Sequence, residues 1–174
     1  MTEAATLTIA LRLEVEDFLY RESRLLDEHR HDDWLALLDD TFVYRMPLPV
    51  AHEEISAGRY DSVIELANES KSFLRMRFGR ISSDFAWAER PAPFLRHFVS
   101  NVIVEAALGN DAGDELVVLS NVMVVRSRQP EDPVLASAGR RDRMRRHGES
   151  FLLLERIVYL DTEVPNDGQL GVIY

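Results

Sequence analysis

The sequence contains no cysteine. Disulfide bonds, thiolate zinc sites, cysteine nucleophiles and the cysteine ligands of an iron–sulfur cluster are therefore excluded for this chain. Long hydrophobic runs are also missing, since the longest, such as 116–119 and 151–154, span only a few residues. A membrane-spanning helix needs roughly 20 apolar residues in a row. We expect no part of the chain to cross a membrane.

Positive charge is scarce, because 30 acidic residues face 20 basic ones and leave a net charge of −10. Such a surface repels nucleic-acid phosphates and anionic lipid head groups, so neither is an expected partner. Residues 1–5 have neither the basic nor the continuous apolar part of a secretory signal. We therefore expect a cytoplasmic protein.

The common catalytic and cofactor motifs are missing as well. The sequence has no glycine-rich phosphate loop, no GxSxG elbow, no HExxH and no dinucleotide fingerprint. What it has is 174 residues with 46% hydrophobic content, the size of one domain that buries roughly two thirds of its unfolded surface. We expect a single domain over residues 1–174, with 1–10 as a loosely ordered tail.

Helical patterns occupy the first part of the chain. Apolar residues at helical spacing predict a long amphipathic helix over 11–26, with Glu22 interrupting its apolar stripe. Asp32 and Asp33 precede the apolar run 34–38, and carboxylates at a helix start accept free N–H groups and suit the helix dipole. A second, shorter helix is predicted there. A third helix is predicted over about 73–85 from its loosely helical apolar spacing.

Strand patterns dominate the rest. β-Branched and aromatic residues at 41–46 predict a strand that Pro47 and Pro49 end, whereas 51–70 is polar and weakly patterned. Short polar links with turn residues then separate long β-rich runs, which predicts an antiparallel meander. These runs are 95–107, 115–128, 134–146 and 150–161.

Helices followed by long antiparallel strands predict an α+β fold with the helices packed on one face of a mainly antiparallel sheet. Long strands twist strongly, so the sheet curves and the helices on its concave side complete a cone. This is the shape of the NTF2-like, or cystatin-like, fold. The same fold serves isomerases, dehydratases, transport factors and structural subunits, so it does not assign a function by itself.

Four polar residues form a candidate catalytic pocket. Strand alternation predicts that His97 and Asn101 share one face, and Asp40 and Tyr44 come from the earlier strand region. Together they would supply a general base, an orienting carboxylate and a hydroxyl donor for acid–base catalysis on a neutral small molecule. The alternative is that these groups satisfy one another and nearby backbone inside the cone, as buried polar groups generally do.

A metal site is a weaker hypothesis. His29 and His31 with Asp32 or Asp33 offer the two histidines and the carboxylate of a non-haem iron site. An HxH pair at a junction between helices points its rings in divergent directions. We expect a solvated link and no metal here.

Arginines are concentrated in residues 140–147. On a strand, Arg141 and Arg143 point to one face and Arg140 and Asp142 to the other, so both faces carry charge. We interpret this segment as a solvated strand end or as an interface in which arginines pair with carboxylates. The negative net charge and the lack of interleaved aromatics disfavour nucleic-acid binding.

Trp87 lies in an apolar aromatic segment, 84–89, that is followed by Pro91 and Pro93. Tryptophan often anchors interfaces, but capping of a core is equally ordinary, and both interpretations stay open. The interface candidates are Trp87, Arg96, Arg140, Arg141, Asp142 and Arg143.

Several segments taken together resemble the β subunits of ring-hydroxylating dioxygenases of the biphenyl, naphthalene and phenylpropionate type. Each segment is a weak signal, but their order and spacing are specific and cover about residues 12–162. They are 18–22 with 25–27, 34–38 running into 44–47, then 77–81, 86–89, 96–102 and 139–142 with the arginine-rich strand that follows. The chain departs from the family at 162–174, although Leu170, Val172 and Tyr174 alternate and predict a short terminal strand.

The resemblance implies a non-catalytic subunit without metal or cofactor, assembled with a larger α subunit as an α3β3 hexamer for aromatic compound degradation. In that family the α subunit carries a Rieske [2Fe–2S] cluster and a mononuclear Fe(II). Electrons come from NADH through separate components, and dioxygen is added to the ring as a cis-dihydrodiol. The missing cysteines agree, since a Rieske centre needs two. The alternative is a free-standing NTF2-like dehydratase or isomerase that uses Asp40, Tyr44, His97 and Asn101.

Overall fold

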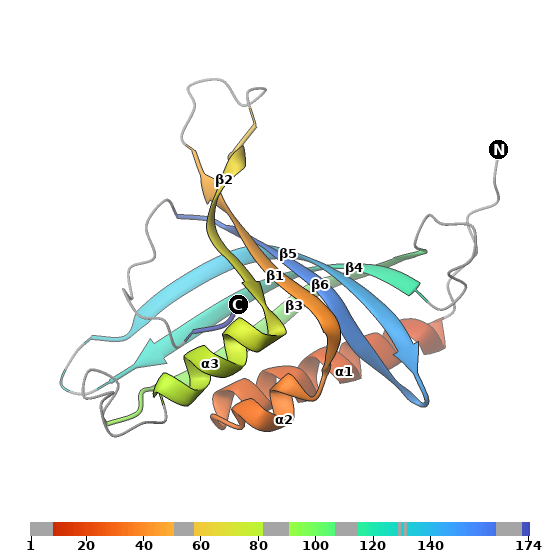
Figure 1. Cartoon of the computed structure of the whole chain (residues 1–174), viewed down its shortest axis with the longest axis horizontal. Helices are drawn as coiled ribbons and strands as arrows, with labels where there is room; N and C mark the ends of the chain where they lie inside the picture. The colour runs from red at the N-terminus through yellow and green to blue at the C-terminus, as the bar shows by residue number, and fades with distance from the viewer. Residues whose placement is uncertain are drawn as a thin grey trace.

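The computed structural model describes residues 9–50, 58–81, 91–106, 115–128, 130, 132–162 and 172–174. In these ranges the chain forms helices and a sheet in which all strands are connected (Figure 1). The elements are, in chain order, α1 (Ile9–Asp27), α2 (His31–Leu35), β1 (Leu38–Pro49), β2 (Tyr60–Ser70), α3 (Lys71–Ile81), β3 (Phe94–Ala106), β4 (Glu115–Ser127), β5 (Val134–His147) and β6 (Ser150–Leu160).

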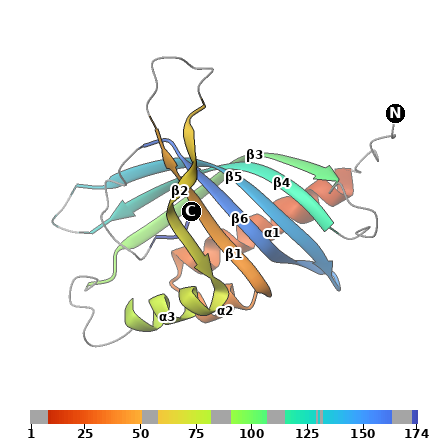
Figure 2. The same cartoon turned by 45° about the horizontal axis from the view of Figure 1, so that its top comes forward.

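The sheet has the strand order β2-β1-β6-β5-β4-β3. β3 to β6 form the predicted antiparallel meander, β1 adds to β6 in parallel, and β2 pairs antiparallel with β1. The strands curve strongly, and the helices lie together on the concave side of the sheet (Figures 1 and 2). The predicted α+β cone is confirmed. Within the described ranges, no helix has both the length and the apolar character needed to cross a membrane.

β1 and β2 correct two predictions. β1 continues past Pro47 to Pro49 because bulges shift its register against β2 on both sides of Pro47. Bulges are positions at which a strand tolerates proline. β2 was not predicted, because it is an edge strand in which no side chain is fully buried, so its sequence lacks a clear alternation.

The helix boundaries also differ from the predictions. α1 begins at Ile9, inside the range expected to be a loose tail. α2 ends at Leu35, and Leu38, expected to be helical, is the first residue of β1. α3 ends at Ile81, and the rest of the segment predicted to be helical lies outside the described residues.

The predicted terminal strand is wrong for the part of it that is described. Val172, Ile173 and Tyr174 have no strand assignment, yet all three are buried. Alternation predicts one buried face and one exposed face. Here every side chain finds apolar surroundings, because the segment enters the interior of the cone.

The core lies between the helices and the concave face of the sheet. Phe18 of α1 packs edge-on against Phe151 of β6, with ring centroids 5.9 Å apart. Trp34 of α2 makes similar edge contacts with Phe42 of β1 and Phe78 of α3. Aromatic pairs of this geometry add to the free energy gained from burial. Two groups of aromatic contacts thus attach the helices to the sheet, one through α1 and one through α2 and α3.

Replacing Phe18 by alanine should lower the free energy of unfolding by about 3–5 kcal/mol, because the substitution leaves a cavity between α1 and β6. Urea denaturation followed by circular dichroism measures the change. Tyr20→Ala, on the exposed side of the same helix, is the control and should change stability by no more than about 0.5 kcal/mol. Similar losses for both variants would contradict the placement of the core.

Candidate functional site

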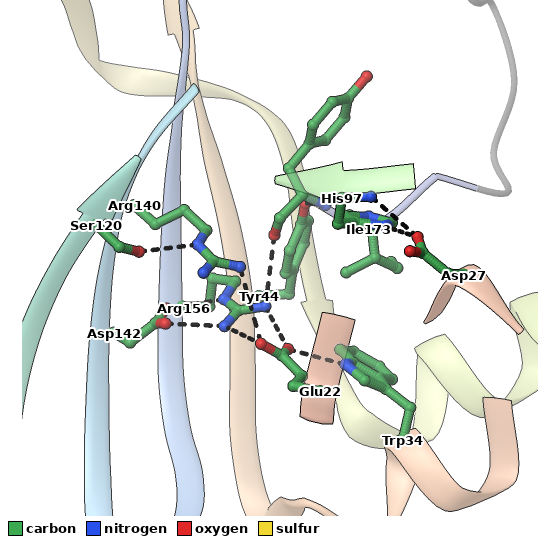
Figure 3. A network of polar contacts seen from close by, with 11 residues as sticks. Glu22, Asp27, Trp34, Tyr44, His97, Ser120, Arg140, Asp142, Arg156 and Ile173 are labelled. Carbon is green, nitrogen blue, oxygen red and sulfur yellow. Dashed lines mark hydrogen bonds and ion pairs between the residues drawn. The ribbon is translucent and has the colours of Figure 1, made fainter. Parts of the chain in front are cut away.

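Arg156 lies in the middle of β6 and its side chain is 0% exposed. Its Nε and Nη2 donate to the two carboxylate oxygens of Asp142 on β5, both at 2.8 Å. Its Nη1 and Nη2 donate to the carboxylate of Glu22 on α1, at 2.6 and 3.0 Å (Figure 3). The guanidinium therefore binds two carboxylates, each through two hydrogen bonds, which is the strongest arrangement available to this pair of groups.

Three further side chains complete this buried cluster. Trp34 donates its indole N–H to Oε1 of Glu22 at 2.9 Å. Nη1 of Arg140 lies 3.8 Å from Oε2 of Glu22, and its Nε donates to Oγ of Ser120 at 3.1 Å. Two arginines thus face two carboxylates, and the cluster has no net charge. Charges removed from water are tolerated only when they are paired in this way.

The cluster shifts the pKa values of its members. Burial by itself would raise the pKa of Glu22, but the charges of Arg156 and Arg140 and the hydrogen bonds from Arg156 and Trp34 lower it to about 2. Burial would likewise lower the pKa of Arg156, but Asp142 and Glu22 hold it well above its usual value. For Arg140, burial and the charge of Arg156 prevail and its pKa is lowered. Glu22 and Arg156 therefore keep their charges at neutral pH.

This cluster corrects the interpretation of the arginine-rich strand. The predicted alternation is confirmed, with Arg141 and Arg143 on the outer face and Arg140 and Asp142 on the inner one. The interpretation as a solvated strand end or an interface is wrong for the inner face, because Glu22 and Arg156 pair with its residues inside the chain's own core. As interface candidates, Arg140 and Asp142 are unavailable to a partner, whereas Arg141 and Arg143 are accessible.

A second polar cluster joins the end of α1 to the start of β3. Asp27 accepts hydrogen bonds from the main-chain N–H of His97 at 3.0 Å and from its Nδ1 at 2.6 Å. Nε2 of His97 lies 2.8 Å from the carbonyl oxygen of Ile173. Both ring nitrogens face oxygen acceptors, and the ring donates to both when it carries two protons. Arg96, an interface candidate, is exposed and lies 3.6 Å from Asp27.

Tyr44 of β1 is buried in the same region. Its hydroxyl oxygen accepts the main-chain N–H of Tyr174 at 3.3 Å. Burial raises the pKa of Tyr44 to about 12, so the hydroxyl stays protonated at neutral pH. His97 and Tyr44 are therefore both engaged with residues 173–174.

The structure does not bring the predicted catalytic residues together. The side chain of Asp40 is 97% exposed and pairs with Lys71 at 2.9 Å. Asn101 is exposed, because a bulge after Ser100 and a left-handed backbone, with φ of 54° at Asn101, reverse the alternation of β3. The prediction that His97 and Asn101 share a face is wrong for this reason. Tyr44 and His97 are both buried and have the structural contacts described above.

The rings of His29 and His31 make an edge contact, with centroids 5.9 Å apart and planes at 87°, so the expectation that they diverge is wrong. Nε2 of His29 lies 2.9 Å from the carbonyl oxygen of Pro93. His31 stacks on Phe78 at 4.1 Å between ring centroids, and burial, followed by the charge of His29, lowers its pKa to about 4. In the part of the chain that the structure describes, no three potential metal ligands come together.

The surface has pockets whose charged residues are already paired with other residues of the chain. One of about 470 Å³ lies along α1 and β3 and is lined by Asp27, Arg96 and His97, among others. The Asp27 and His97 groups that reach it already pair with each other. A second, of about 340 Å³, combines apolar side chains of α1 with Arg21, Arg24 and Arg30, each of which pairs with a neighbouring carboxylate. Trp87 lies outside the described residues.

Glu22, Asp27 and Arg156 were missed as important residues by the sequence analysis. The available signal was position: Glu22 interrupts the apolar stripe of α1, and Arg156 interrupts an apolar strand at a position that alternation sends inward. A charged residue on a buried face needs a partner of opposite charge. The sequence does not say which one, since Glu22 and Arg156 are 134 residues apart.

The curved sheet with helices on its concave side is the cystatin-like, or NTF2-like, fold. A protein with a cystatin-like fold from Nostoc punctiforme superposes over 91% of this chain, with a TM-score of 0.59 and 21% identity. The family model for the ring hydroxylating beta subunit matches residues 21–167. The chain therefore belongs to the family of β subunits of ring-hydroxylating dioxygenases.

Individual relatives agree with this membership. The chain is 33% identical to the 3-phenylpropionate/cinnamic acid dioxygenase subunit beta of Photorhabdus laumondii over 94% of this chain and 92% of the relative. It is 31% identical to the benzene 1,2-dioxygenase subunit beta of Pseudomonas putida, over 92% and 87%. The beta subunit of a Burkholderia mallei benzoate 1,2-dioxygenase superposes with a TM-score of 0.72 at 25% identity, over 97% and 99%. A naphthalene 1,2-dioxygenase structure shares the fold, with a TM-score of 0.83 at 23% identity, over 97% and 88%.

Replacing Arg156 by methionine should cost about 3–5 kcal/mol of stability at pH 7, because two buried carboxylates lose their partner. The deficit relative to the unmodified chain should shrink as the pH falls. As the pH falls from 4.5, the ordinary pKa of Glu22, to about 2, its pKa in the folded chain, the unmodified chain loses the stabilisation that Glu22 provides. In the variant, protonation at low pH removes the unpaired buried charge of the carboxylates, so the variant is less destabilised there. Urea denaturation at several pH values measures both effects.

The matched control is Arg143→Met on the outer face of β5, where the arginine side chain is 47% exposed. It should change stability by about 0.5 kcal/mol or less at every pH. Equal losses for the two variants would refute the central role of Arg156.

Proposed function

We propose that this chain is the non-catalytic β subunit of a multicomponent Rieske non-haem iron dioxygenase that dihydroxylates aromatic rings. It would assemble with its α subunit and further copies of itself as an α3β3 hexamer in the cytoplasm. The observation that carries the proposal is the pairing inside the cone. Arg140 and Arg156 neutralise the carboxylates of Glu22 and Asp142. His97 and Tyr44 are bound to the chain's own residues. None of these groups is left over as an acid or base for a substrate.

The Rieske [2Fe–2S] cluster and the mononuclear Fe(II) are proposed to belong to the α subunit, with electrons supplied by NADH. The donor set supports this division, because a Rieske cluster needs two cysteines and this sequence has none. The best candidate ligands for iron, His29 and His31, are engaged with Pro93 and Phe78.

The aromatic substrate class is proposed from the relatives. They are named for 3-phenylpropionate or cinnamic acid and for benzene. A role in aromatic compound degradation follows, with the reacting ring held by the α subunit. The alternative, a free-standing dehydratase or isomerase, is not favoured, because Asp40 and Asn101 are exposed, away from the buried His97 and Tyr44.

Co-expression with an α subunit, which we expect to be encoded by a neighbouring gene and to carry C-x-H and C-x-x-H motifs, tests the proposal. We expect the two chains to purify together and to convert an aromatic substrate to a cis-dihydrodiol when reductase, ferredoxin and NADH are supplied. The chain by itself should show no turnover. A stable monomer or dimer that does not bind the α subunit and has its own dehydratase or isomerase activity would overturn the proposal.

Arg141 on the outer face of β5 tests the proposed interface. Its side chain is 41% exposed, and its Nη1 is loosely paired, at 4.0 Å, with Oε2 of Glu155. Arg141→Ala should weaken assembly, as should Trp87→Ala, because arginine and tryptophan side chains anchor many interfaces. Loss of the large species on size-exclusion chromatography measures the effect.

The control is Arg12→Ala, since Arg12 is exposed and pairs with Glu16 within α1. It should leave the hexamer intact. If the Arg141 and Trp87 variants also remain hexameric, the assignment of these residues to the interface is wrong.

A further inference from the structure

Residues 172–174 lie inside the cone although they belong to no helix or strand. The side chains of Val172, Ile173 and Tyr174 all join the hydrophobic core, and Ile173 is only 1% exposed. Figure 3 shows Ile173 beside His97, with Asp27 on the other side of the histidine ring.

Side chains of the cone hold the main chain of this segment. Nε2 of His97 lies 2.8 Å from the carbonyl oxygen of Ile173, and Tyr174 donates its N–H to the hydroxyl of Tyr44. Nη1 of Arg156 lies 3.5 Å from the main-chain oxygen of Tyr174. A strand in a sheet pairs main chain with main chain. Here a few polar side chains orient an otherwise apolar segment, which is how pockets bind ligands.

His97 and Arg156 have other partners that fix their positions. Asp27 holds His97 through Nδ1 and through the main-chain N–H. Glu22 and Asp142 hold Arg156 through four hydrogen bonds. The donors are therefore placed independently of residues 172–174, and a site of this kind is organised before its occupant arrives.

The charge balance indicates which ligand fits. Arg156 is already neutralised by two carboxylates, so it offers a carbonyl oxygen a hydrogen bond and has no excess charge for an anion. His97 likewise pairs with Asp27. The surroundings of Val172, Ile173 and Tyr174 are apolar. A neutral peptide main chain with apolar and aromatic side chains suits this site better than an ion.

We propose that the interior of the cone, at Tyr44, His97 and Arg156, is a binding site for a short apolar peptide that contains an aromatic residue. Val172–Tyr174 is its internal occupant in this chain. The site accepts the same sequence as a separate molecule when the chain's own segment is removed. This inference goes beyond the proposed role as a β subunit and does not rest on it.

The test uses a chain that ends at Gly171 and the peptide Val-Ile-Tyr, which, like the comparison peptide, is N-acetylated and C-amidated so that its ends carry no charge. Removal of three buried residues should lower the thermal midpoint by on the order of 10 °C. The peptide should then raise it again saturably, by about 3–6 °C at roughly ten times its dissociation constant. The peptide Val-Asp-Tyr, with a charge in place of the buried isoleucine, should have no such effect.

Tyr44→Phe in the shortened chain tests the assigned contact. It removes the hydroxyl that accepts the N–H of Tyr174, so the peptide should bind about 2- to 10-fold more weakly. Tyr60→Phe is the matched control, since the Tyr60 hydroxyl donates to the carbonyl of Leu160 and does not contact the segment. It should leave peptide affinity unchanged.

Three outcomes would overturn the inference. The shortened chain could be as stable as the full one, the peptide could give no saturable shift, or both peptides could act alike. If the shortened chain does not fold alone, refolding in the presence of each peptide decides. Recovery with Val-Ile-Tyr alone supports the site, and recovery with neither peptide refutes it.

Discussion

The hydrogen bonds from Arg156 to Glu22 and Asp142 connect the layers of the molecule. One guanidinium on β6 joins α1 to the neighbouring strand β5, and Glu22 extends the connection to α2 through Trp34. Apolar contacts are non-directional and by themselves permit small shifts of a helix along a sheet. Buried charges do not, because any shift leaves a charge without its partner at a cost of several kcal/mol. The position of α1 on the sheet is therefore specific.

This arrangement also explains how a fold that hosts enzymes elsewhere can serve as a subunit. In the concave space of the cone, Arg140, Asp142 and Arg156 point inward from the sheet, and Glu22 enters from the helix layer (Figure 3). The two positive charges balance the two negative ones inside the cone. Close by, His97 and Tyr44 hold the buried residues 172–174.

Local patterns in the sequence were sufficient for much of the fold. The strands β3 to β6 were predicted within a few residues, because long alternating runs and turn residues depend only on near neighbours. β2 was not predicted, since an edge strand buries too little side-chain surface to require alternating apolar and polar residues. The predicted assignment of side chains to the two faces of β3 is wrong at Asn101, because a bulge there reverses the faces of the strand. A bulge depends on the partner strand as well as on the local sequence.

The sequence by itself determined the absence of thiolate chemistry, the α+β class and the alternating faces of the arginine-rich strand, since each follows from composition or local periodicity. The order and spacing of several sequence segments also resemble those of the β subunits of ring-hydroxylating dioxygenases. Only the tertiary structure decided that the inner arginines are buried. Their charge could enter the core because Glu22, from the other end of the chain, meets them there. Pairing between distant residues leaves no periodic signal, and so it becomes visible only when the chain is folded.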